Sequence, residues 1–308
     1  MTINSDSSII PPFLSDHDHI ELIAPARSVL KKDIDSAIKI IESNRLAVVY
    51  SNNLFDHKDI FSGTKDQRVH YFQKALDNPK TKAIFFVRGG YGSIQIIDDI
   101  DFSSFSKNPK WLVGFSDITT ILMHVYSQYR INSIHGPMPF NFQKTESVSI
   151  NNIFNLLRGN FQNMEFPAHK LNKTGITSGV LIGGNLSVLC SLIGSPSFTR
   201  THHDTILFIE DVDEYIYHIE RMMYMLSRSG FLGRIKGLIV GKMTDIRDNQ
   251  IAFGQTVYQA INTITKQYNY PVCFNAPIGH SKNNNPIIIG AKIRLDVNSK
   301  CSKIYISK

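Results

Sequence analysis

Short apolar runs alternate with helical patterns along the first part of this chain. Strands are expected at residues 20–23, 46–50, 83–87, 111–113 and around 132–135. A continuous apolar run such as 83–87 is typical of a strand buried on both faces. Apolar residues recur at helical spacing in 30–41, 66–76 and 118–125. This alternation predicts a doubly wound α/β domain with a parallel sheet.

The pattern changes after Pro139. Residues 141–175 are polar and Asn-rich, with one short helical pattern at 153–157, and we interpret them as a linker. Beyond it, a strand, a glycine turn and a helix start are expected in 179–189, strands at 205–210, 237–241, 272–275 and 287–296, and helices at 215–226 and 257–268. This half is predicted to be α+β, with more hairpin-like strands.

The length of 308 residues fits two domains. We expect an N-terminal α/β domain in 1–145 that begins with a loose tail to residue 18, a linker in 146–175, and a C-terminal domain in 176–308. With 42% hydrophobic and 19% charged residues, the chain is not a disordered polymer.

The net charge of +7 is scattered along the chain and accompanies no motif for RNA or DNA, so we expect no nucleic-acid partner. A basic surface also suits an anionic small substrate. Cys190, Cys273 and Cys301 are too widely spaced for a structural zinc site. We see no secretory signal and no membrane-spanning stretch, and expect a cytoplasmic protein.

Residues 110–126 contain the most informative pattern. A short apolar strand is followed by Gly114 and Ser116, and a helical pattern begins directly afterwards. A serine at such a turn is lifted to the mouth of a parallel sheet, where free amides of the helix can stabilise an oxyanion. The alternative is that Ser116 and Asp117 cap an ordinary helix.

A nucleophilic serine needs a base and an orienting carboxylate. Glu210 is the best carboxylate, because it closes the apolar run 206–209, whereas the acids that follow it are expected to cap the next helix. Among the histidines, His135 and His280 both lie in glycine-containing turns after strands, and spacing alone leaves the choice open. The others are expected in the tail (His17 and His19), in a helix (His124) or in a solvated turn (His202 and His203), with metal binding as the alternative for the last two.

A glycine-rich segment, 88–93, follows the apolar run 83–87. Such glycines let backbone amides approach a ligand closely, so Gly89 and Gly90 are candidates for an oxyanion hole. The segment matches neither established nucleotide-binding pattern, and a plain tight turn is the alternative.

Six short motifs now occur in one order: Phe86-Val-Arg-Gly-Gly-Tyr-Gly92, Gly114-Phe-Ser-Asp117, His135-Gly-Pro137, Gly183-Gly-Asn-Leu186, Phe208-Ile-Glu-Asp211 and Gly279-His280. Together they resemble the LD-carboxypeptidases, serine peptidases that trim muropeptides, and their relatives that inactivate microcin C. The resemblance runs from about residue 23 to residue 296. It departs from the family at Arg27, in a turn usually rich in Ser, Gly and Pro, and at Asp213, where glycine is frequent.

The resemblance implies a triad of Ser116, His280 and Glu210. It also implies a flavodoxin-like N-terminal domain of the class I glutamine-amidotransferase type, with a smaller β-rich C-terminal domain that supplies the glutamate and the histidine. A cytoplasmic homodimer without metal or cofactor is expected, and the substrate is a muropeptide.

The mechanism expected from this resemblance is acyl-enzyme hydrolysis. The amides of Asp117 and of Gly89 or Gly90 would hold the oxyanion. Arg88 or another cation would hold the terminal carboxylate, with a structural role as the alternative for Arg88. The remaining candidates for substrate binding are Tyr91, His135 and Asn185.

Three rival functions remain at this point. A microcin-immunity peptidase would need an aromatic stack, and the single tryptophan, Trp111, belongs to the strand before Ser116, although a Tyr or Phe can also stack. An α/β-hydrolase esterase shares the Ser, Glu, His order but not the Ser-Asp turn or the two-domain layout. A non-catalytic binding protein on the same fold would not need an intact set of the three residues.

Overall fold

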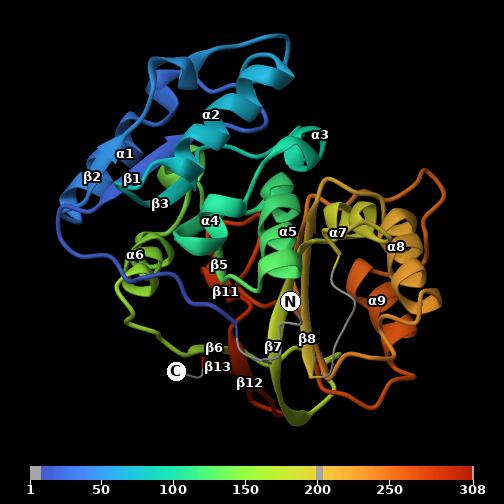
Figure 1. The fold of residues 1–308 in the computed structure, drawn as a ribbon. Coiled ribbons are helices and arrows are strands. Elements are labelled where there is room, and N and C mark those ends of the chain that lie inside the picture. The colour runs from blue at the N-terminus through green and yellow to red at the C-terminus, as the bar shows by residue number, and fades with distance from the viewer. Residues whose placement is uncertain (1–7, 199–203, 307–308) are drawn as a thin grey trace.

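A computed structural model describes residues 8–198 and 204–306, whose strands form two sheets. Figure 1 shows the N-terminal half, blue to green, beside the C-terminal half, yellow to red. In the described residues the first sheet has the order β11 (Ile287–Ile289), β5 (Ser133–His135), β4 (Trp111–Gly114), β3 (Thr81–Phe86), β1 (His19–Ile23) and β2 (Ala47–Val49). All neighbours are parallel except β11 and β5, so the predicted parallel sheet is confirmed.

Helices follow the strands of this sheet in the chain and pack against it. The helices of this half are α1 (Asp35–Ser43), α2 (Lys65–Asp77), α3 (Ser93–Ile96), α4 (Ser103–Lys107), α5 (Thr119–Tyr129) and α6 (Ser147–Leu157). Short 3-10 turns lie at η1 (Lys31–Asp33), η2 (Asn52–Phe55), η3 (Ile97–Asp99), η4 (Ser116–Ile118) and η5 (Pro139–Lys144). The α2 helix begins at a Thr64–Gln67 capping box and packs against β1 and β3.

The second sheet, within the described residues, has the order β10 (Val272–Cys273), β9 (Gly237–Thr244), β8 (Thr205–Val212), β7 (Gly175–Asn185), β12 (Lys292–Val297), β13 (Cys301–Ile306) and β6 (Met164–Pro167). Its helices are α7 (Leu186–Leu192), α8 (Ile216–Arg228) and α9 (Val257–Thr265). The strands β10 to β7 are parallel, so the expected hairpin-like pairing holds only for β12, β13 and β6.

Three segments differ from the sequence-based expectation. The interval 146–175 carries α6 and β6, and β6 pairs with β13 of the second sheet. The β11 strand comes from the C-terminal part of the chain but pairs with β5 in the first sheet, as Figure 1 shows in red beside green. Gly183 and Gly184 continue β7, which leads directly into α7 without a glycine turn.

The tail is also packed against the body of the protein. Leu14 is buried, the Trp111 indole donates a hydrogen bond to the Pro12 carbonyl (3.0 Å), and the Phe13 ring stacks on Trp111. Residues 8–18 are therefore not the loose tail that their polar composition suggested. The apolar side chains in the tail supply the burial that composition alone did not reveal.

The two halves meet closely where β7 ends. A Cβ on Gly184 (φ +151°) would lie 2.4 Å from Thr119 Cγ2 at the start of α5, which is closer than real side chains come. The Asn185 amide, the next along the chain, donates to Thr119 Oγ1 (3.1 Å). Glycine at 184 thus lets the end of β7 approach the helix that follows Ser116.

Candidate active site

Ser116 lies on a strained turn between β4 and α5. Its φ of +63° is in the left-handed region, which a non-glycine residue rarely adopts. Gly114 makes the turn possible, because a Cβ there would lie 2.8 Å from Ile118 Cγ2. Strain of this kind at the end of a buried strand is the geometry of a nucleophile elbow. It favours the nucleophile interpretation of Ser116 over that of a simple cap.

Gly89 lies directly beside the serine, where there is little room for a side chain. A Cβ at this position would lie 3.1 Å from Ser116 Cβ and 3.3 Å from Ser116 Oγ. A side chain would therefore crowd the hydroxyl, whereas glycine brings backbone close to it. The candidate oxyanion-hole residues Gly89 and Asp117 are thus both next to Ser116.

The Asp117 carboxylate holds the glycine-rich segment in place. It is buried and accepts a hydrogen bond from the Ser93 amide (2.9 Å), and the Gly92 amide also favours its ionised form. Burial nevertheless raises the pKa of Asp117. Its side chain is therefore structural, which leaves only its amide for an oxyanion.

Arg68 supports the same segment from α2, and sequence reasoning missed it. Its buried guanidinium donates to the carbonyls of Pro25 (2.9 Å) and Gly92 (3.0 Å) and to Gln95 Oε1 (2.6 Å). Position 68 shares a helix face with the buried Phe72 and Ala75. An arginine on an apolar face was the available signal, because a buried guanidinium requires partners.

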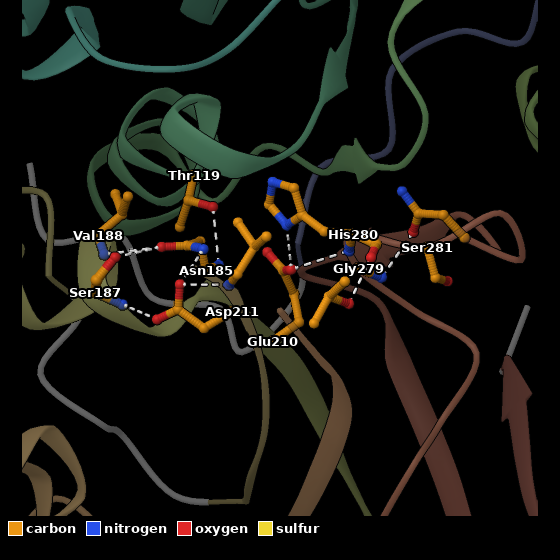
Figure 2. A network of polar contacts seen from close by, with 12 residues as sticks. Thr119, Asn185, Ser187, Val188, Glu210, Asp211, Gly279, His280 and Ser281 are labelled. Atoms are coloured by element: carbon orange, nitrogen blue, oxygen red, sulfur yellow. Dashed lines mark hydrogen bonds and ion pairs between the residues drawn. The ribbon is translucent and has the colours of Figure 1, made fainter. Parts of the chain in front are cut away.

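Glu210 and His280 form the central pair of the site. Glu210 is fully buried at the end of β8, and its Oε2 accepts hydrogen bonds from His280 Nδ1 (2.7 Å) and from the His280 amide (3.2 Å). Figure 2 shows the second ring nitrogen of His280 on the edge of the ring away from Glu210. The contact at Nδ1 leaves Nε2 as the atom that can accept a proton.

The two groups alter the pKa of each other. Burial alone would raise the pKa of Glu210, but the charge and hydrogen bonds of His280 outweigh it and lower that pKa. Burial would lower the pKa of His280, but the charge and hydrogen bond of Glu210, with the charge of Asp211, raise it. The pair is therefore an ionised carboxylate that favours a protonated imidazole.

Phe115 connects this pair to the serine turn. Its ring centroid lies 4.7 Å from that of His280, and the next residue along the chain is Ser116. Within the residues that the structure describes, no hydrogen bond joins Ser116 Oγ to His280, so the expected contact between them is not present. Catalytic hydrogen bonds of this kind are often long before substrate binds.

A cleft of about 610 Å³ opens beside the pair. Phe115 and His280 line it together with Lys144 and Lys282. Glu146 also lines it, so the cleft carries two lysines and one carboxylate. Its volume is in the usual range for a small-molecule site.

His135 is buried beside the pair and does not contact it as a base would. Its ring packs between Phe115 and Phe208, with centroid distances of 5.9 Å and 4.9 Å. Burial lowers the pKa of His135 to about 4. It is therefore neutral near pH 7, and neither ring nitrogen has a hydrogen-bond partner among the described residues.

Asn185 and Asp211 form a neighbouring network, also drawn in Figure 2. Asn185 Nδ2 donates to Asp211 Oδ1 (2.9 Å), while its Oδ1 accepts from the Val188 amide (3.2 Å). Asp211 Oδ2 accepts from the Ser187 amide (3.0 Å), so Asp211 caps α7 and not the helix that follows it. Burial and the charge of Glu210 raise the pKa of Asp211 to about 7. These contacts give Asn185 a structural role, and substrate binding by it stays a prediction.

The other acids after Glu210 also differ from the capping expectation. Asp213 has φ +60° and pairs with Arg247, and Glu214 contacts His218 in α8 (2.7 Å). Glycine adopts the left-handed conformation of residue 213 most readily, and aspartate tolerates it better than most other residues.

The side chain of Arg88 is held by other protein groups, whereas that of Tyr91 is exposed to solvent. Arg88 Nη1 donates to the Ser28 carbonyl (2.9 Å) and its guanidinium lies over the Phe140 ring, whereas the Tyr91 side chain is exposed. Arg88 therefore has a structural role at least in part.

The remaining candidates are separate from the site. His124 Nδ1 is bonded to Ser197 Oγ (2.9 Å), and burial raises the pKa of Cys190 and of Cys273 to about 12. His202 and His203 lie outside the described residues. In residues 8–198 and 204–306, no group of three or more His, Cys, Asp or Glu side chains is placed to hold a metal ion. None of the helices in this part of the chain is both long and apolar enough to cross a bilayer.

Comparison with known proteins gives one consistent family. Residues 20–136 match the LD-carboxypeptidase N-terminal domain, and residues 178–295 match the LD-carboxypeptidase C-terminal domain. A probable murein peptide carboxypeptidase of Bacillus subtilis is 28% identical, over 96% of this chain and 93% of the relative.

Solved structures agree with this. The crystal structure of muramoyltetrapeptide carboxypeptidase from Oxalobacter formigenes has a TM-score of 0.85 and 26% identity, and the match covers 94% of this chain and 99% of that one. The microcin C7 self immunity protein MccF, in complex with aspartyl sulfamoyl adenosine, has a TM-score of 0.86 at 19% identity, with 97% and 99% covered. At that identity the second likeness concerns the fold.

Proposed function

This chain belongs to the LD-carboxypeptidase family, and on that premise we propose that it is a serine peptidase acting on murein tetrapeptides. The bond hydrolysed joins the L-configured centre of a diamino acid to the terminal D-alanine. The observation that carries this proposal is the strained turn at Ser116, which lies beside the Gly89 backbone. The ring of Phe115, the residue before Ser116, contacts His280 of the Glu210–His280 pair.

The proposed reaction has two steps. Glu210 holds His280 through Nδ1, so that Nε2 removes the proton of Ser116 as its Oγ attacks the amide carbonyl. The Asp117 amide and a Gly89 or Gly90 amide stabilise the oxyanion, and His280 passes its proton to the amine of the departing D-alanine. Water activated by His280 then hydrolyses the acyl-enzyme and restores Ser116.

In this mechanism, the side chains of Ser116 and His280 have to come within hydrogen-bond distance of each other. Phe115 and His280 both line the cleft, and Ser116 follows Phe115 in the chain. Catalytic hydrogen bonds of this kind often form only when substrate is bound.

The mechanism is tested with a murein tetrapeptide and the Ser116→Ala variant. We expect the wild-type protein to release D-alanine and the variant to lose about 10⁴-fold or more in kcat, because triad members act as a unit. Release is followed by mass spectrometry, and circular dichroism checks that the variant is folded. Ser43→Ala, an exposed serine in α1, is the matched control and should keep full activity.

Two outcomes would contradict the proposal. Hydrolysis at the wild-type rate by Ser116→Ala would remove Ser116 from the mechanism. Preferential cleavage of an aspartyl-nucleoside amide would favour a microcin-type substrate. That reading has less support, because Trp111 is fully buried and unavailable to stack on a base.

We further infer a cytoplasmic homodimer with a part in cell-wall recycling, from the resemblance of the sequence to its family. Light scattering coupled to size-exclusion chromatography measures the mass in solution. A particle of twice the chain mass of 34.9 kDa is expected, and a monomer at micromolar concentration would exclude the dimer.

A further inference from the structure

Arg27 departs from the family pattern, and its side chain covers one of the two glycines beside Ser116. It lies in the turn after β1, where its backbone bridges to Phe61. A Cβ on Gly90 (φ +108°) would lie 2.4 Å from Arg27 Cδ, 2.8 Å from Cγ and 3.2 Å from Nε. The aliphatic stem of Arg27 therefore packs directly on Gly90, and the guanidinium begins at that point.

Gly90 is the neighbour of the glycine that faces the serine. The Cβ position of Gly89 is 3.3 Å from Ser116 Oγ, and Gly90 is the next residue, so the backbone of these two glycines lies between the Arg27 stem and the serine. The exposed Arg27 side chain thus lies against the glycine-rich segment that carries the candidate oxyanion-hole amides.

The charge of Arg27 is not neutralised by the protein. Arg27 is exposed, and no ion pair or hydrogen bond of its guanidinium occurs among the described residues. A second cation is close, because burial and then the charge of Arg27 lower the pKa of Arg88. The Arg88 guanidinium is fixed by the Ser28 carbonyl and the Phe140 ring. The Asp33 carboxylate acts on the pKa of Arg88 in the opposite direction, so two guanidinium groups face one carboxylate. The remaining positive charge favours an anionic ligand.

We propose that Arg27 binds the free carboxylate at the end of the peptide substrate, with Arg88 as a second positive charge behind it. This inference rests on the proposed function, in which the leaving group is D-alanine and the scissile carbonyl is one residue from a terminal carboxylate. A planar guanidinium can hold a carboxylate through two parallel hydrogen bonds. Arg27 would then make the enzyme a carboxypeptidase, because an internal peptide bond offers no such carboxylate.

The test compares two substrates that differ only in this group. They are a murein tetrapeptide with a free C-terminal carboxylate and the same peptide as its C-terminal amide. The variant Arg27→Met keeps an unbranched apolar stem over Gly90 but removes the charge. For the acid, we expect KM to rise about tenfold with little change in kcat, the size of one exposed charge-assisted contact. For the amide, kcat/KM should change less than about twofold, and Arg27→Lys should recover part of the loss.

Arg234→Met is the matched control, an exposed arginine in the C-terminal half, and it should match the wild type on both substrates. If Arg27→Met cleaves the acid with wild-type KM, or loses the same factor on acid and amide, Arg27 serves packing alone and the inference is overturned. If the wild-type protein cleaves neither peptide, the proposed function itself is contradicted. If the wild-type protein cleaves the acid and Arg27→Met cleaves it equally well, only the role of Arg27 is contradicted.

Discussion

Among single residues, the ionisation of His280 decides at which pH the proposed site works. Only neutral imidazole can accept the proton of Ser116, and the charges of Glu210 and Asp211 raise the pKa of His280 above its ordinary 6.5. We therefore expect kcat/KM to fall on the acid side with an apparent pKa above 6.5. In Glu210→Gln this limb should move to lower pH, because removal of the negative charge weakens proton binding, and kcat should fall about 10²-fold or more.

His135→Ala serves as the control for that profile. Burial keeps the pKa of His135 at about 4, so its loss should leave the position of the acidic limb unchanged while lowering activity modestly. If the limb moves in His135→Ala and stays in place in Glu210→Gln, His135 is the base.

Single residues could be selected from the sequence where a motif coincides with a change in the spacing of hydrophobic residues. Ser116 was recognisable as a candidate because the hydrophobic period switches from strand to helix around it, and Glu210 was a candidate because it closes an apolar run. The choice between His135 and His280 was not decided by spacing, since both follow strands and their distance to Glu210 depends on how two sheets meet. The triad itself stays a prediction, since Ser116 and His280 are not hydrogen-bonded.

Among the secondary-structure elements, the contact between β7 and α5 holds Ser116 in place relative to Glu210. Gly184→Ala would put a methyl group 2.4 Å from Thr119 Cγ2, at a φ of +151° that alanine rarely adopts. We expect a loss of about 2–4 kcal/mol in the free energy of unfolding, together with reduced kcat/KM, because the start of α5 must shift. Urea titration and the tetrapeptide assay measure the two effects.

Gly194→Ala is a suitable comparison for this variant. Gly194 also has a positive φ (+89°), but its Cβ position has no neighbour within 4 Å. Its cost should be about 1 kcal/mol from the backbone alone, with unchanged activity. Equal losses in the two variants would show that the β7–α5 contact has no special importance.

The elements that local pattern predicted well are the buried parallel strands. The β3, β4 and β8 strands are continuous apolar runs flanked by polar residues, and the structure places them where expected. The β11 strand was predicted as a strand without its partner, because a pairing between Ile287 and His135 depends on chain closure and not on local period. The polar composition of 146–175 concealed β6 for the same reason.

For the molecule as a whole, the tail connects segments that are far apart in sequence. Phe13 contacts both Trp111 and Phe161, with centroid distances of 6.3 Å and 5.8 Å. Phe13→Ala should cost about 1–3 kcal/mol and shift the fluorescence of Trp111, the single tryptophan, to longer wavelength as water reaches the indole. Val148→Ala, which shortens an exposed side chain elsewhere, should change neither quantity. An unchanged emission spectrum in Phe13→Ala would mean that the tail does not shield Trp111.

The pairing of β11 with β5 sets the order in which this protein can mature on the ribosome. The strands β1 to β5 are synthesised first, yet the outer edge of β5 stays unpaired until residues 287–289 have left the ribosome, close to the end of a 308-residue chain. Until then the nascent sheet presents an open edge to other chains and is a site for a chaperone to cover. Residues 210 and 280 are also synthesised long after Ser116, so the proposed site can be complete only once most of the chain has been made.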